Sequence, residues 1–414
     1  MSETDATAHP RMRPVEALPV RMNGQDMVCL RDPEGLAERP IFLNRFLVFV
    51  VSRMDGTNSL RDIQADIVRT TGEIFPMEDL EEIVRQLDEQ RYLDSPAFQD
   101  FYLSLRQEFR NATARPTHHA GKAYEAAADA LARQLEGFFT HADGPGLNWR
   151  PDPARPLRGL IAPHIDFHRG GPTYAHAYRA LGEHPDVDRF ILFGTCHHPM
   201  QQRFALTAKD FETPLGPAIA DREFISLLAS KLKEDYSLDE FAHRGEHSIE
   251  FQAVCLRYIC AAARGFKIVP ILVGSFQDIC EQSRTPSEIP EVREMVHAVR
   301  ETMAQRPAHY CIVAGADLAH VGRQFGDPSG PTEASLREVE RDDRSFLELV
   351  VSGDAEGMFR SIAMDNDRRR VCGYPAIYMT LSCLENPSGK LLQYRQWADL
   401  ESGAAVTFAS VAFF

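Results

Sequence analysis

Short apolar runs that alternate with helical stretches after residue 157 constrain this chain more than any other feature. A strand that is exposed on one face alternates apolar and polar residues, whereas these runs are almost continuously apolar, which indicates strands buried on both faces. The runs are LRGLIAP (157–163), DRFILFG (188–194), FKIVPILVG (266–274) and HYCIVAGA (309–316). They predict an α/β fold in which helices cover a central sheet.

The first hundred residues follow a different pattern. The segment VRMNGQDMVCL has Asn-Gly at its centre, which predicts a β-hairpin. Helical spacing of apolar residues and capping signals predict short helices after it. These helices are RFLVFVVSRM (45–54), LRDIQADIVRTT (60–71) and MEDLEEIVRQLDEQ (77–90). A small β element with two or three short helices predicts a winged-helix-like α+β domain.

The domain boundaries follow from these two patterns. Residues 1–17 are polar and without apolar periodicity, so we expect a flexible tail. The winged-helix-like module is predicted over 18–105, a linker over 106–118, and the α/β domain over 119–414. A long Ala-rich helix is expected at the start of the α/β domain, from Lys122 to Thr140.

Composition excludes several functions. The chain carries 45 Lys+Arg against 60 Asp+Glu, a net charge of −15, so we expect no nucleic-acid partner. Its longest apolar stretch is far short of the roughly 20 residues that span a bilayer, so we expect no membrane partner. The N-terminus lacks the apolar core of a signal peptide, which predicts a cytoplasmic protein. The 8 cysteines form no CxxC pair, which argues against a zinc ribbon.

Polar side chains follow three of the apolar runs directly. Ligands bind outside the carboxyl ends of the strands in an open α/β sheet, so these side chains are expected to converge. The segment GEHSIE (245–250) adds an imidazole and two carboxylates. The candidate site residues are His164, Asp166, His197, His198, Glu246, His247, Glu250, Asp317 and His320. Such a set suits a metal site or a general acid–base site, and the residues alone leave both open.

Simpler interpretations apply to single residues. A lone histidine after a strand is more often a hydrogen-bonding turn residue than a ligand. His197 and His198 are adjacent and point in different directions, so at most one is expected to contact a metal. Cys372, taken alone, would be a buried small hydrophobe. The absence of GxGxxG after a strand, GxxxxGK[ST], GxSxG and HExxH removes the main support for dinucleotide, NTP, serine-hydrolase and zincin functions.

Several motifs resemble the MEMO family, which includes the AmmeMemoRadiSam system protein B. The motifs are APH (162–164), GTCHHP (194–199), FETPLG (211–216), EHSIEFQ (246–252), IVPILVG (268–274), ADLAHVG (316–322) and VCG (371–373), and they occur in the family's order and spacing. The segment HHAGKAYEAAADALARQLEGFF (118–139) is similar to the family's opening, so the resemblance covers about 115–414.

This resemblance implies a core related to the class III extradiol dioxygenases. The implied metal ligands are His164, His197 and Cys372, with Fe(II) as the expected metal and copper as the alternative, because such ligands suit soft or redox-active metals. Asp317 and His320 match the family's Asp-x-x-His and are implied to be the catalytic acid–base groups. The remaining candidates, His198, Glu246, His247, Glu250 and Asp166, are implied to line the pocket. The family usually has Gly-Arg after the cysteine; here Tyr374 follows Gly373, so a basic group is lost.

The N-terminal segment resembles PqqD-like winged-helix modules through MDGTNSLRDI (54–63) and RYLDS (91–95). Such modules hold a peptide, often against a radical SAM enzyme. The resemblances together imply a small-molecule or peptide substrate and radical SAM and AMMECR1-like partner proteins; the alternative for the module is a docking appendage. Two functions stay open: a metal-dependent oxidoreductase, and a non-enzymatic metal-binding scaffold that recruits a partner enzyme.

Overall fold

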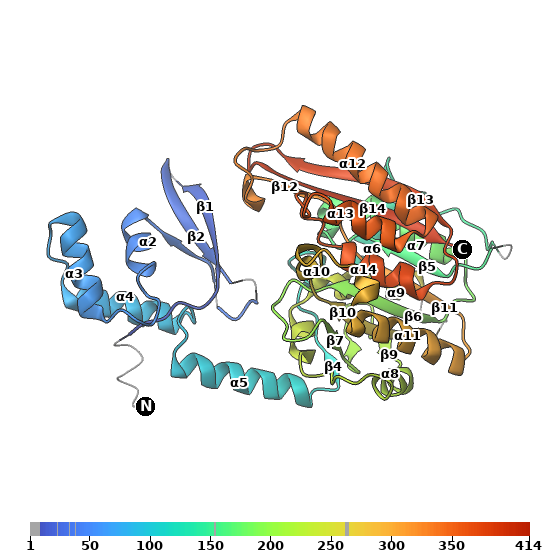
Figure 1. The fold of residues 1–414 in the computed structure, drawn as a ribbon, viewed down its shortest axis with the longest axis horizontal. Coiled ribbons are helices and arrows are strands. Elements are labelled where there is room, and N and C mark those ends of the chain that lie inside the picture. Colours follow the sequence, from blue (N-terminus) through green and yellow to red (C-terminus); the bar gives the residue numbers. More distant parts are fainter. Residues whose placement is uncertain (1–8, 23, 33, 38, 153–154, 261–264) are drawn as a thin grey trace. The chain divides into compact units, whose positions relative to one another are not determined.

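The computed structural model describes residues 9–22, 24–32, 34–37, 39–152, 155–260 and 265–414. Within this described part, the chain forms two compact units, an N-terminal unit (Met1–Asn111) and a C-terminal unit (Ala112–Phe414) (Figure 1). Each unit has its own clusters of buried apolar side chains. Each is therefore described by itself.

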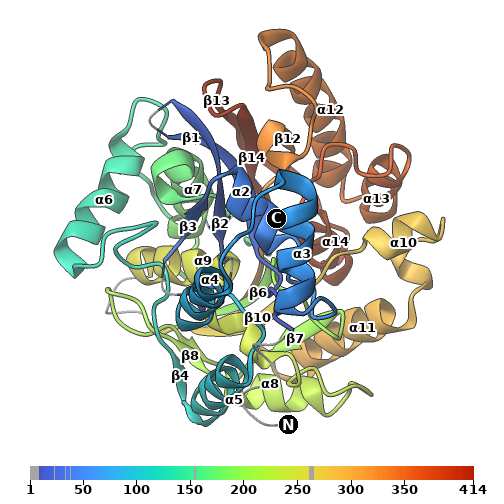
Figure 2. The ribbon, with the colours of Figure 1, turned by 90° about the vertical axis from the view of Figure 1, so that its left-hand side faces the viewer.

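The N-terminal unit combines an antiparallel sheet with helices, which can be followed in Figure 2. Its elements are β1 (Glu16–Met22), β2 (Gln25–Arg31), β3 (Ile41–Leu43), α2 (Arg45–Val51), α3 (Leu60–Thr71), α4 (Met77–Glu89) and α5 (Pro96–Asn111). The predicted hairpin is confirmed, because Met22 pairs with Gln25 across the turn. Gly24 adopts a φ of 79°, which favours glycine, while Asn23 lies outside the described residues.

Helix α3 begins and ends where local chemistry predicts. The Ser59 hydroxyl accepts from the N–H of Asp62, and the Asp62 carboxylate accepts from the N–H of Ser59, which completes a capping box. Gly72 ends the helix in the left-handed conformation with a φ of 76°. Ile63 and Ile67 on the inner face are buried in the unit's core.

Two segments differ from the sequence prediction. Residues 1–8 of the predicted flexible tail lie outside the described residues, but Arg13 is buried and donates to Asp32 at 3.0 Å. The predicted linker is partly helical, because α5 continues to Asn111, and Arg115 lies in the short strand β4 (Ala114–Arg115). Isolated contacts and a two-residue strand leave no periodic pattern in a sequence, whereas α5 has an apolar face, with Phe98 and Phe109 buried, that the prediction missed.

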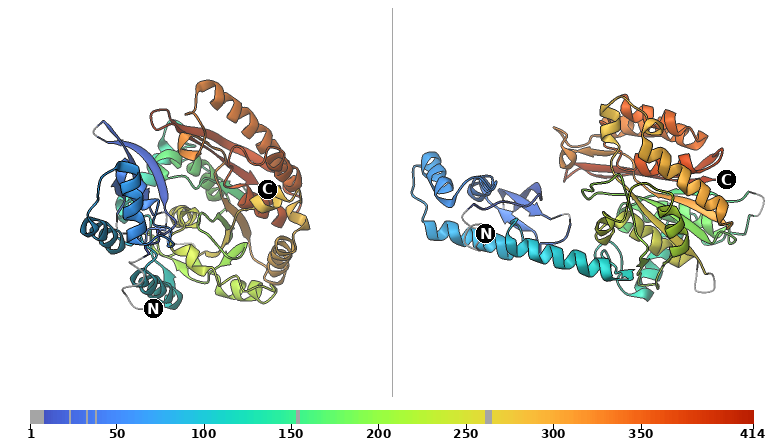
Figure 3. Two further views of the ribbon diagram at one scale, coloured as in Figure 1. Left: turned by 60° about the vertical axis from the view of Figure 1, so that its left-hand side comes forward. Right: turned by 60° about the horizontal axis from the view of Figure 1, so that its bottom comes forward.

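The C-terminal unit contains, among the described residues, a mixed sheet with the path β12-β14-β5-β11-β6-β10-β7. Its parallel strands are β5 (Gly159–Ala162), β11 (Tyr310–Gly315), β6 (Arg189–Thr195) and β10 (Lys267–Val273). Antiparallel strands flank them: β14 (Ala404–Phe413) and β12 (His320–Gly322) on one side, β7 (Phe204–Leu206) on the other. Figure 3 shows β14 and its partner β13 (Gly389–Asp399) in red. The predicted α/β architecture is confirmed.

Helices cover both faces of this sheet, which explains the continuous apolar runs. One face packs against α6 (Ala128–Thr140), α7 (Phe167–Gly182) and α9 (His247–Ile259). The other face packs against α8 (Arg222–Ala229), α11 (Pro290–Gln305), α12 (Glu333–Ser352), α13 (Ala355–Ala363) and α14 (Tyr374–Cys383). In β6, Phe190 and Leu192 join the first cluster, and Ile191 and Phe193 join the second. Burial of each such side chain stabilises the fold by about 1.5–3 kcal/mol.

Helix α6 begins at Ala128, later than the predicted start at Lys122. The preceding residues form turns instead, and Tyr124 among them is buried. No helix in the described part of the chain is long and apolar enough to cross a membrane.

Candidate metal centre

Three histidines meet where the carboxyl ends of β5 and β6 approach the amino end of α9. His164 follows β5, His197 follows β6, and His247 is the first residue of α9. Their candidate ligand atoms all lie within 4.8 Å of one another. The ring centroids are 5.0 Å apart for His164 and His197, 5.3 Å for His164 and His247, and 4.8 Å for His197 and His247. The spacing suits one bound metal ion.

Glycines at the ends of β6 and β11 let the first turn of α9 pack closely against these strands. A Cβ atom on Gly315, the last residue of β11, would lie 2.5 Å from the carbonyl oxygen of Ser248. A Cβ on Gly194 in β6 would lie 2.4 Å from the side chain of Ile249. Real Cβ atoms do not approach other heavy atoms so closely, so a larger residue at either strand end would push α9 and His247 away.

The hydrogen bonds of His164 fix its tautomer. Its Nδ1 lies 3.0 Å from the carbonyl oxygen of Gly315, and because a carbonyl only accepts, Nδ1 carries the proton. The Nε2 atom therefore keeps a free lone pair, which lies 3.2 Å from the Sγ of Cys372. Burial holds the pKa of His164 well below its ordinary value, so the ring is neutral. A neutral imidazole with Nδ1–H bonded to a carbonyl is the usual form of a metal-binding histidine.

One buried carboxylate, Glu246, orients the other two rings. It accepts the backbone N–H groups of His197 and His247, both at 2.8 Å. Its oxygens also lie 3.2 Å from the Nδ1 of His197 and 3.1 Å from the Nδ1 of His247. Although burial alone would raise its pKa, the two histidines hold the pKa of Glu246 well below the ordinary value. The charged carboxylate leaves Nε2 of both rings free to bind a metal.

Cys372 approaches this group from the loop before α14. Burial raises the pKa of its thiol well above the ordinary value, and the nearby Asp317 carboxyl raises it further. The side chain is therefore a thiol unless a cation lies beside it, and a coordinated metal deprotonates a thiol. Its Sγ is near Nε2 of His164, but the thiol is not one of the three side chains whose candidate ligand atoms all lie within 4.8 Å of one another, so its role as a ligand stays a prediction.

Asp317 and His320 follow β11 and lie around the same centre. Asp317 is buried, accepts the backbone N–H of His164 at 2.9 Å, and has its pKa raised by burial to about 7. The Nδ1 of His320 donates to the carbonyl of Leu318 at 3.1 Å, and the ring also hydrogen-bonds to the backbone of Arg370. Burial lowers the pKa of His320 to about 4, so this ring is neutral and can accept a proton.

A family model described as Memo-like protein matches residues 115–412. The chain belongs to the Memo-like protein family. It is 28% identical over 394 residues to a MEMO1 family protein of Aquifex aeolicus, covering 94% of this chain and 96% of the relative. It is 26% identical over 349 residues to the MEMO1 family protein TTHA0924 of Thermus thermophilus, covering 84% of this chain and 96% of the relative. It is 30% identical over 305 residues to a MEMO1 family protein of Sulfolobus acidocaldarius, covering 71% of this chain and 97% of the relative.

These matches confirm the resemblance to the MEMO family. The match with the Sulfolobus protein covers 71% of this chain, whereas the match with the Aquifex protein covers 94% and so includes most of the N-terminal unit. The PqqD-like character of that unit and the assignment to AmmeMemoRadiSam system protein B stay predictions.

The structure places the remaining predicted site residues of this Memo-like protein in several different environments. His198 and His197 both line a surface cavity of about 490 Å³. Asp166 precedes α7, and its carboxylate lies 3.9 Å from Arg169. The carboxylate of Glu250 is bound by Arg115 rather than directed at the three rings, with the closest oxygen 2.5 Å from Nη1. His247, expected to line the pocket, instead belongs to the group that could hold the metal.

Three residues that surround Glu250 were not among those predicted from the sequence: Arg115, His119 and Tyr124. Arg115 and His119 fell at or beside the predicted linker, where no apolar period marks a buried residue. The segment HHAG, which contains His119, resembles the family's opening and was the signal that this stretch belongs to the Memo-like unit.

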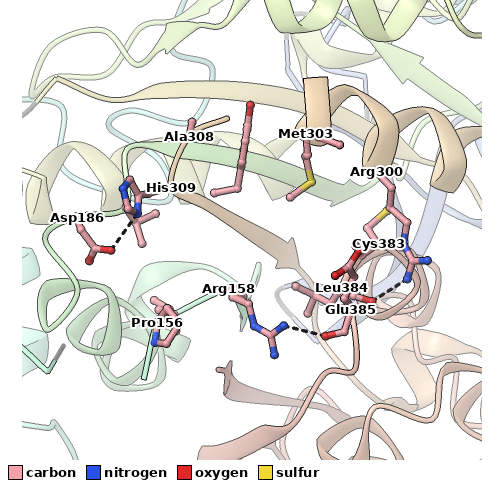
Figure 4. A pocket seen from close by; sticks show the side chains of 14 residues that line it. Pro156, Arg158, Asp186, Arg300, Met303, Ala308, His309, Cys383, Leu384 and Glu385 are labelled. Atoms are coloured by element: carbon pink, nitrogen blue, oxygen red, sulfur yellow. Dashed lines mark hydrogen bonds and ion pairs between the residues drawn. The ribbon is translucent and has the colours of Figure 1, made fainter. Parts of the chain in front are cut away.

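Figure 4 shows a second cavity, of about 400 Å³, beside the amino ends of β5, β6 and β11. The three clustered histidines lie near the opposite, carboxyl ends of these strands. Arg300 donates to the carbonyl of Leu384 at 2.8 Å, and Arg158 donates to the carbonyl of Glu385 at 2.8 Å. These two guanidinium groups therefore cap the carboxyl end of α14. The cavity is separate from the metal centre.

Proposed function

We propose that the C-terminal unit binds one redox-active metal ion at its histidine cluster and acts as a metal-dependent oxidoreductase. The observation that carries this proposal is the cluster itself, in which His164, His197 and His247 each have Nδ1 engaged and their candidate ligand atoms lie within 4.8 Å of one another. His164, His197 and Cys372 are the proposed ligands, and His247 is positioned as a further donor.

The donor set suits Fe(II), with copper as the alternative. Imidazole and thiolate favour soft or redox-active transition metals, whereas magnesium and calcium prefer oxygen ligands. When bound, such a metal supplies a binding position for a substrate oxygen or for O₂ and a route for electron transfer. This chemistry is what the relation to class III extradiol dioxygenases implies.

The protein's own residues perform the remaining tasks in this proposal. Glu246 holds His197 and His247 in the tautomer that can bind a metal. His320, neutral because burial lowers its pKa to about 4, accepts a proton from the substrate or from water. The cavity beside His197 is large enough for a small molecule or the side chain of a peptide.

Metal analysis tests this proposal first. Protein purified with and without oxygen should carry about one iron or copper per chain, and oxygen uptake with a panel of catechols should exceed that of the metal-free protein. Cys372→Ser should lose the metal with the fold retained. Stoichiometric metal in Cys372→Ser would remove the thiol from the ligand set, and a chain without metal under both conditions would overturn the proposal.

A second function is a metal-binding scaffold that performs no turnover. The N-terminal unit favours it, because this unit has its own hydrophobic core and is suited to hold a separate partner. A radical SAM enzyme or an AMMECR1-like protein is the proposed partner. Metal binding without oxygen uptake, together with capture of a radical SAM protein that depends on residues 1–111, would favour the scaffold.

A further inference from the structure

A buried ion pair joins Arg115 in β4 to Glu250 in the first turn of α9, beside the candidate metal centre. Arg115 and Glu250 both have fully buried side chains, and Nη1 of the arginine lies 2.5 Å from Oε2 of the glutamate. A buried pair is costly unless further hydrogen bonds satisfy its remaining donors and acceptors. The additional partners of this pair therefore indicate what it holds in place.

The arginine side of the pair holds the backbone of Glu246. Nε of Arg115 donates to the carbonyl of His243 at 2.6 Å, and Nη2 donates to the carbonyl of Glu246 at 2.9 Å. These carbonyls belong to the turn that leads into α9. Because the carboxylate of Glu246 orients His197 and His247, a shift of this turn would move both rings.

The glutamate of the pair also fixes a segment that contacts His247, but a different one from the turn that Arg115 holds. Glu250 accepts the backbone N–H of His119 at 3.0 Å and the hydroxyl of Tyr124. These bonds fix the segment that carries the His119 ring. That ring packs edge-on against His247, with 5.7 Å between the centroids and 74° between the planes.

Both routes reach His247, and the route through Glu246 also reaches His197. We propose that Arg115 and Glu250 are positioning residues that hold His247 in place to bind the metal; this inference rests on the proposed function. Neither residue is a ligand. Their effect passes through Glu246 on one route and through His119 on the other.

The chain offers a matched control far from the metal. Arg189, the first residue of β6, donates through Nε to the buried Asp221 at 3.0 Å. Asp221 caps the amino end of α8. This pair also joins a strand to a helix, but it lies at the amino end of β6, whereas His197 follows the carboxyl end.

The test uses the full chain, freed of metal and titrated with Co(II) against a competing chelator. Arg115→Lys keeps the charge but loses the fork of donors, so Co(II) should bind about 10- to 100-fold more weakly and the Co(II) absorption spectrum should change. Arg189→Lys should leave affinity and spectrum unchanged. If Arg115→Lys fails to fold, Tyr124→Phe should show the same effect with a smaller loss.

A double-mutant cycle separates positioning from general destabilisation. In a His247→Ala background, Arg115→Lys should cost clearly less Co(II) affinity than it does in the unaltered chain, because only its route through Glu246 to His197 remains. Full, additive losses in both backgrounds would overturn the inference. Equal Co(II) affinity of the unaltered and Arg115→Lys chains would also overturn it, whereas failure of the unaltered chain to bind any metal would overturn the proposed function instead.

Discussion

The two units of this protein are specified by interactions of different range. In the N-terminal unit, α3 is bounded by Ser59 and Gly72, which act within a few residues of the helix. In the C-terminal unit, the decisive contacts join distant segments, such as His164 with Cys372 and Arg115 with Glu250. Local signals build the first unit, while the candidate metal centre of the second can form only after the sheet has assembled.

Removal of a buried ring should have the largest effect and act on the C-terminal unit alone. His164→Ala takes away a nitrogen donor and the partner of Cys372, so metal content should fall to background while circular dichroism stays that of a folded protein. His297→Ala is the control, because that imidazole is exposed on α11 and pairs with Glu301. Retention of a full metal equivalent in His164→Ala would contradict the proposed centre.

Loss of the proposed proton carrier should separate turnover from binding. His320→Ala should keep its metal, because His320 lies outside the group of converging rings, yet lower any turnover by about 10²–10⁴-fold. Single-turnover rates alongside metal analysis measure both quantities. Loss of metal in this variant would make His320 a ligand, and full activity would make it a structural residue.

A core substitution in the N-terminal unit tests whether this unit is stabilised independently of the C-terminal unit. Ile63 is fully buried, so Ile63→Ala should destabilise this unit by about 2–5 kcal/mol. Chemical denaturation, with hydrogen exchange assigned to each unit, should show the loss in α3 and α4. Arg61→Ala, on the exposed side of α3, is the control. A matching drop in metal affinity would show that the two units are not independent.

The sequence predicted much of the fold because the strands of the sheet and helices such as α3 carry local patterns. It also predicted that His164 and His197 would lie near each other, since strand ends converge in an open sheet, and it placed His247 among the pocket-lining residues. The part played by Cys372 came from the family resemblance alone, because an apolar neighbourhood makes a cysteine look like any small core residue. Arg115 was missed, because nothing in its local sequence shows that a distant Glu250 would bury it.

The smallest effect should come from the cap of α3. Ser59→Ala removes one half of the capping box and should cost the helix about 1 kcal/mol, seen as faster amide exchange in α3.

The hydrogen bonds from the Ser59 side chain and backbone also lower the pKa of Asp62. A carboxylate with a lowered pKa stabilises the folded state above its ordinary pKa and loses this contribution as pH falls through the lowered value. Protection of α3 should therefore decline in acid below about pH 3.8, and less so in Ser59→Ala, whose Asp62 is closer to its ordinary pKa. Since the cap acts only on its own helix, exchange in β5 and β6 should not change; a change there would mean that the local signals of the first unit also support the second.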